Sequence, residues 1–84
     1  RSDSLTNPIK LLRQSNHLTR QELGYLLGIG YSAIAQVELG HTATIPESWQ
    51  QGLERLGLDY YDLQEDYLEW REAQREALEQ RLAQ

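Results

Sequence analysis

The chain contains no cysteine, which excludes disulfides and zinc sites built from thiolates. Its only imidazoles are His17 and His41, and two histidines without a nearby acidic partner make a poor metal site. Long hydrophobic runs are also missing, because the longest uncharged stretch, residues 23–37, contains three glycines and several polar side chains. We therefore expect no metal, no cofactor and no membrane span, and without a signal-peptide pattern we expect a cytoplasmic protein.

A surplus of basic charge is missing too, since the formal net charge is −5 at pH 7. The acidity is confined to one end: residues 1–58 carry five basic and five acidic groups, whereas residues 59–84 carry three and eight. A neutral front part permits binding to DNA but favours only weak non-specific affinity. A chain of 84 residues is one marginally stable domain that a partner subunit would help. Because it begins at Arg1 rather than methionine, we expect a fragment of a longer protein.

Caps and apolar spacing predict five helices and no strand. The start and stop signals are, in chain order, Asn7-Pro8 to about Asn16; a capping box of Thr19 and Glu22 opening a second helix; Tyr31 to Leu39, closed by Gly40; a second capping box of Thr44 and Glu47, with Gly57 as the stop; and Asp59 to about Leu82. The fourth helix has one apolar face made of Ile45, Trp49, Leu53 and Leu56.

Residues 20–39 meet the steric demands of two helices that cross steeply at a short turn. Gly24 supplies a small residue where such helices touch, and Gly28 can take the positive φ that the turn needs. The inward positions are all apolar: Leu23, Leu27, Ile29, Ile34 and Val37. The outward positions of the second helix are small or polar, which suits a helix inserted into a major groove: Tyr31, Ser32, Ala35 and Gln36.

These residues resemble the phage repressor and Cro family, the XRE-type helix-turn-helix proteins. The segments that carry the resemblance are Leu18-Thr19-Arg20-Gln21-Glu22-Leu23-Gly24, Leu27-Gly28-Ile29 and Ile34-Ala35-Gln36-Val37-Glu38-Leu39-Gly40. The resemblance covers about Ile9 to Leu58 and implies an all-α, five-helix, lambda-repressor-like fold, with the helix-turn-helix DNA-binding domain at residues 7–58. A polar leader at residues 1–6 would precede this domain, and an acidic, extended C-terminal helix at residues 59–84 would follow it.

The resemblance also implies a role for individual residues. Base contacts would come from Tyr31, Ser32, Ala35 and Gln36, with Gln36 bonding adenine and Ala35 packing on a thymine methyl. Phosphate contacts would come from Arg20, Gln21, His41 and Thr42, and Arg13 would form a structural ion pair with Glu38. Other interpretations stay open: the arginines as ordinary surface charges, Tyr31 as a packing aromatic, and His41 as a solvated loop residue.

The sequence departs from the family in its charge near the recognition helix. That helix has no lysine or arginine, and residues 41–44 are uncharged apart from histidine protonation. Each missing phosphate contact removes about one unit from the salt dependence of binding. We therefore expect weak, dimer-dependent binding, or a domain that has partly exchanged DNA for protein.

The acidic C-terminal helix has an apolar seam at spacings of three, four and three, suited to another helix. The seam consists of Tyr60, Leu63, Tyr67 and Trp70. It predicts a dimerisation or partner-binding face, and the alternative is a frayed, solvated tail. Arg71 has no opposite charge three or four residues away on this helix.

Together these features predict a transcriptional regulator, a repressor that binds a palindromic site in double-stranded DNA as a homodimer, in the bacterial nucleoid or a phage-infected cell. The alternative is an antitoxin- or antirepressor-like interaction module whose partner binds residues 59–84. An enzyme is not expected, because the carboxylates at 62, 65, 66 and 69 have no histidine or pocket-forming element nearby. The pattern Gly-x-Gly-x-x-Ala at residues 28–33 needs a preceding strand to bind a dinucleotide, and a capped helix precedes it instead.

Overall fold

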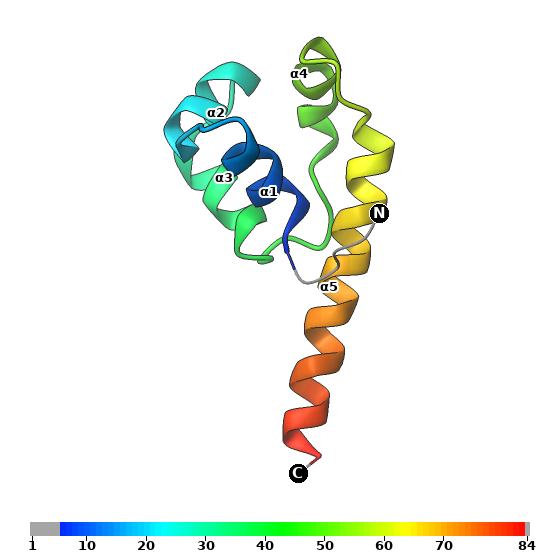
Figure 1. Cartoon of the computed structure of the whole chain (residues 1–84). Helices are drawn as coiled ribbons and strands as arrows, with labels where there is room; N and C mark the ends of the chain where they lie inside the picture. Colours follow the sequence, from blue (N-terminus) through cyan, green and yellow to red (C-terminus); the bar gives the residue numbers. More distant parts are fainter. Residues whose placement is uncertain (1–5, 84) are drawn as a thin grey trace.

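Five α-helices and one short 3-10 helix make up the regular structure of the computed structural model, which describes residues 6–83 (Figure 1). They are α1 (Pro8–Ser15), α2 (Arg20–Leu27), α3 (Tyr31–Glu38), the 3-10 helix η1 (Glu47–Trp49), α4 (Gln50–Arg55) and α5 (Tyr60–Leu82). Within residues 6–83 there is no strand, so the all-α prediction is confirmed. Residues 1–5 of the predicted leader lie outside the described residues.

Two polar side chains begin the first helices as the sequence predicted. Asn7 accepts hydrogen bonds from the backbone N–H groups of Ile9 and Lys10 at 2.9 and 3.3 Å. Its amide nitrogen donates to the carbonyls of Val37 and Glu38 at 2.9 and 3.1 Å, so one buried side chain joins the start of α1 to the end of α3.

The capping box of Thr19 and Glu22 is also confirmed. The Thr19 hydroxyl accepts from the Glu22 N–H at 3.1 Å, and the Glu22 carboxylate accepts from the Thr19 N–H at 2.8 Å. These two bonds satisfy two N–H groups that the first turn of α2 leaves without helical partners.

The predicted capping box of Thr44 and Glu47 is wrong. Regular structure begins only at Glu47, as a 3-10 turn with no side-chain cap, after an extended Pro46. The backbone N–H of Ile45 instead donates to the Gln64 side chain of α5 at 2.8 Å, which holds this segment against the last helix. The fourth helix is therefore short, and Leu56, predicted to face inward, lies beyond its end and is 42% exposed.

The core is shared by all five α-helices. Its buried side chains are Ile9, Leu23, Leu27, Ile34, Val37, Ile45, Trp49, Leu53, Tyr60 and Tyr67. The last two come from the first half of α5, which packs against α1 and α4. The second half of α5 extends past the other helices, and this explains the elongated extents of 44 × 24 × 23 Å (Figure 1).

Candidate nucleic-acid interface

The corner between α2 and α3 depends on two glycines. Gly28 ends α2 in the left-handed region with φ +71°, where a residue without a Cβ is unstrained. The Ile29 N–H then donates to the Gly24 carbonyl at 2.7 Å. A Cβ on Gly24 would lie 2.5 Å from the Ile29 carbonyl oxygen, so this close approach of the two segments requires glycine. Both glycines therefore have the steric roles that were predicted for them from the sequence.

The four residues predicted to contact bases lie on the side of α3 that faces away from the core. Ile34 and Val37 turn inward and are buried. Tyr31 is 56% exposed, Ser32 and Gln36 are exposed and Ala35 is half-buried. The exposed face carries no charged side chain of its own, because the one ionised residue of α3, Glu38, is buried.

Glu38 lies between two arginines, of which the sequence analysis identified one as its partner. Its side chain has no exposed surface and accepts from Nε and Nη2 of Arg13 at 2.7 and 3.1 Å. Nε of Arg20 donates to the same carboxylate at 3.2 Å. Two guanidinium groups and one carboxylate leave a net charge of about +1 at the junction of α1, α2 and α3.

Arg20 keeps an open side despite this contact, since 30% of its side chain is exposed. A hydrogen bond with Tyr31, and next the bond with Glu38, raise the pKa of the Arg20 guanidinium above its ordinary value. Arg20, Gln21, His17 and Tyr31 line a shallow hollow of about 450 Å³. Arg20 and Gln21, both predicted to contact phosphate, therefore border the same hollow as Tyr31, which was predicted to contact a base.

The loop after α3 holds the other two predicted phosphate contacts in different ways. Gly40, with φ +78°, turns the chain so that the His41 N–H donates to the Gln36 carbonyl at 2.9 Å. The His41 ring donates from Nδ1 to Oε1 of Gln36 at 3.0 Å, because a carboxamide oxygen only accepts. Thr42 is tied to α5 instead: the Tyr67 hydroxyl donates to its carbonyl at 2.8 Å and lies 3.0 Å from its hydroxyl.

The seam on α5 that was predicted to bind a second subunit packs inside the chain itself. Tyr60 and Tyr67 are buried, and Leu63 and Trp70 pack against the same core. The Tyr60 hydroxyl donates to the Ile45 carbonyl at 2.7 Å, and burial raises the pKa of that hydroxyl. Tyr60 and Tyr67 are therefore not available to a partner, so the predicted seam does not form a partner surface as a whole.

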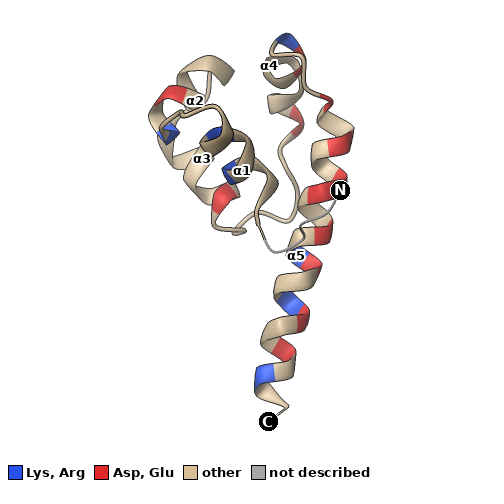
Figure 2. Cartoon of the chain, viewed as in Figure 1, with Lys and Arg blue, Asp and Glu red and all other residues tan. Residues whose placement is uncertain are grey.

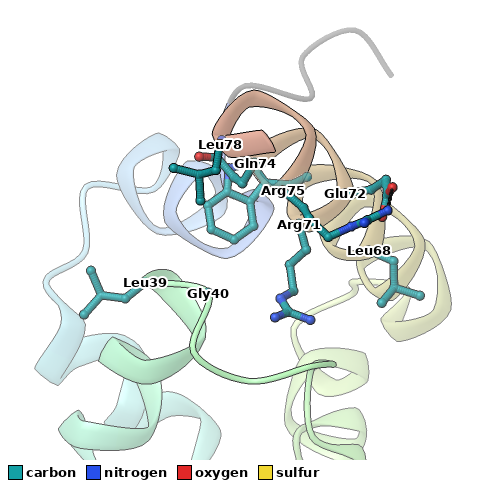
Figure 3. Close-up of a pocket in the computed structure, with 9 residues that line it drawn as sticks. Leu39, Gly40, Leu68, Arg71, Glu72, Gln74, Arg75 and Leu78 are labelled. Atoms are coloured by element: carbon teal, nitrogen blue, oxygen red, sulfur yellow. Dashed lines mark hydrogen bonds and ion pairs between the residues drawn. The ribbon is translucent and has the colours of Figure 1, made fainter. Parts of the chain in front are cut away.

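Arg71 is a further candidate for the interface, and it was not predicted from the sequence. Figure 3 shows its side chain reaching from α5 toward the segment that follows Gly40, and its Nη1 donates to the Ala43 carbonyl at 3.3 Å. The one sequence signal was the lack of an opposite charge at helical spacing from Arg71. Helical spacing alone does not reveal a hydrogen-bond partner that lies on a distant loop.

The charges of α5 divide into two parts (Figure 2). Residues 59–70 contain five acidic side chains and no basic one, whereas residues 71–83 contain three of each. Among the described residues, no cluster of three or more histidine or carboxylate side chains is arranged to hold a metal ion. The same residues include no helix with the length and apolar character needed to cross a membrane.

Comparisons of the chain with protein-family models, with curated proteins and with solved structures find no match.

Proposed function

We propose that this chain is a sequence-specific DNA-binding regulator of the XRE type that reads duplex DNA with the outward face of α3. The observation that carries the proposal is the α2–α3 corner: Gly24 and Gly28 set it, and it leaves Tyr31, Ser32 and Gln36 exposed together on a single short helix. A major groove admits an α-helix, and these side chains are of the sizes and polarities that read base edges there.

The backbone contacts in this proposal lie at the two ends of that face. Arg20 and Gln21 border the hollow beside Tyr31, at the start of α3. His41 lies against Gln36, at the end of α3. A protein that contacts phosphates on both sides of its base-reading helix fixes the register of that helix in the groove.

A repressor of this kind binds a palindromic site as a homodimer in our proposal, because one such corner covers only half of a site. Two recognition helices would enter successive major grooves about 34 Å apart. Because the recognition face is neutral, the affinity of one copy for one half-site is low. A dimer that binds both halves of a palindrome therefore has a much higher affinity than a single copy on a half-site.

A second candidate is a protein-interaction module of the antitoxin or antirepressor kind. The observation that favours it is an open groove of about 630 Å³ between the end of α3 and α5, bordered by exposed leucines. These are Leu39, Leu68 and Leu78, with Trp70 beside them. Exposed apolar side chains gathered around a groove are typical of binding sites for proteins.

The deciding experiment is selection of bound sites by the full chain from a pool of random duplexes at low salt. An enriched palindrome supports the regulator. Gln36→Ala should relax the preference at one base pair per half-site, by about 1–3 kcal/mol of discrimination.

Arg20→Ala should weaken binding to all sequences alike. Arg55→Ala is the matched control, because it removes one exposed cation at the end of α4 and should change neither property. If the folded chain binds no duplex at low salt, the regulator proposal fails.

A further inference from the structure

The loop after α3 runs along α5 and is hydrogen-bonded to it at Thr42, Ala43 and Ile45. The Ile45 carbonyl accepts from Tyr60, the Thr42 carbonyl from Tyr67 and the Ala43 carbonyl from Arg71. Gly40 lies so close to the ring of Trp70 that a Cβ there would come within 2.8 Å of it. Side chains of α5 therefore have defined positions relative to the loop that borders the exposed face of α3.

Arg71 is the only cation among these attachments. Its guanidinium group carries five N–H donors, and the bond to the Ala43 carbonyl uses one of them. A carbonyl acceptor orients the group without neutralising its charge. By contrast Arg75, one turn further along α5, has both Glu72 and Glu79 as partners.

Arg71 places a positive charge beside a loop that has no cationic side chain of its own. Residues 41–44 contain no lysine or arginine, although the loop folds back onto the exposed face through His41 and Gln36. Figure 3 shows Arg71 extending from α5 toward the segment after Gly40, so a helix distant in sequence brings a positive charge to it.

We propose that Arg71 binds a phosphate of the DNA backbone beside residues 41–44, and so provides from α5 the charged contact that the loop does not have. This inference depends on the proposed function, because it assumes that α3 enters the major groove. A planar guanidinium group with several free donors suits a phosphate, whose oxygens accept two parallel hydrogen bonds. The bond to Ala43 holds the group in place before DNA arrives, which lowers the entropy cost of the contact.

The test is the salt dependence of binding, measured by fluorescence anisotropy with a labelled duplex taken from the selected pool. Arg71→Gln is the informative variant, since it removes the charge and keeps a polar side chain at this position. The slope of log affinity against log salt should fall in magnitude by about 0.9 per half-site. Raising the salt from about 50 to about 200 mM should then weaken the variant about 3.5-fold less per half-site than the wild type. Arg71→Lys should keep most of the slope.

Arg81→Gln is the matched control, because it makes the same change of charge on the same helix, near its far end. The proposal is supported if Arg71→Gln lowers the slope and Arg81→Gln does not. It is overturned if Arg71→Gln keeps the slope of the wild type, or if both variants lower it equally. Either of those results leaves the regulator proposal standing, whereas a wild-type chain that binds no duplex removes both.

Discussion

The buried carboxylate of Glu38 offers the most direct test of how the corner between α2 and α3 is held together. Glu38→Gln preserves the shape of the side chain and the backbone carbonyl that Asn7 contacts. It removes the negative charge that two guanidinium groups share at 2.7 to 3.2 Å. Arg13 and Arg20 would then face each other across a neutral amide, without their counter-charge.

The size of the effect follows from burial. Removing one member of a buried ion pair costs about 3–5 kcal/mol, because a charge stays in the interior without compensation. The two arginine side chains are 14% and 30% exposed, so water takes over part of the lost interaction. We therefore expect the free energy of unfolding to fall by about 2–3 kcal/mol, at or below the lower limit of that range. An 84-residue domain has only about 4–13 kcal/mol of stability in all.

Urea and thermal unfolding, followed by far-ultraviolet circular dichroism, measure this change. The melting temperature should fall by roughly 8–24 °C. Glu79→Gln is the matched control, because Glu79 also contacts an arginine, at 3.0 Å, but on an exposed surface. Its stability should equal that of the wild type within error. If Glu38→Gln is as stable as Glu79→Gln, the claim that this carboxylate holds α1, α2 and α3 together is refuted.

Three further predictions test other parts of the structure. Gly24→Ala should lower the free energy of unfolding by about 1–3 kcal/mol, because its methyl group would meet a backbone carbonyl at 2.5 Å, whereas Gly30→Ala, with open space around it, should stay within about 0.5 kcal/mol in the same urea experiment. Burial raises the pKa of Tyr60, so its stabilising contribution is complete below the usual tyrosine pKa and is lost as pH rises through the higher folded value. Tyr60→Phe should therefore flatten the loss of stability above about pH 10, and an equally steep loss in the variant would contradict this. The His41 ring donates to Oε1 of the Gln36 side chain, so in the proposed complex only the Gln36 NH2 group is available, which suits guanine rather than the adenine expected from the sequence. His41→Ala should therefore shift the selected base toward adenine; selection from random duplexes measures the shift, and an unchanged base rules it out.

The features that the sequence predicted best are those that neighbouring residues decide. Asn7, Thr19 and Asp59 cap their helices because a short polar side chain reaches N–H groups two or three residues away. Gly28 and Gly40 follow helix ends where the local backbone takes a positive φ, which favours glycine. The pairing of residues 13 and 38 was implied by the resemblance rather than by any of these local rules.

The failures all involve contacts between distant residues. Thr44 and Glu47 satisfy the local rule for a capping box, but Gln64 binds the Ile45 N–H and keeps the segment extended. An apolar seam on a helix predicts burial without saying which chain covers it, so Tyr60 and Tyr67 were assigned to a partner although they complete the core of their own domain. The contacts of Arg20 with Glu38 and of Arg71 with Ala43 were not predicted for the same reason, because each joins residues far apart in the sequence.

The distribution of charge over the folded chain also bears on how DNA would approach it. The five acidic residues of positions 59–70 avoid the positions of α5 that enter the core. In Figure 2 most of the acidic segments in this part of α5 lie on the side away from α1 and α3. A duplex, itself densely negative, is repelled from that side, whereas the α3 side presents a nearly neutral face bordered by Arg20 and Arg71. A net charge of −5 is therefore compatible with DNA binding, because its placement disfavours the wrong orientation at little cost to the right one.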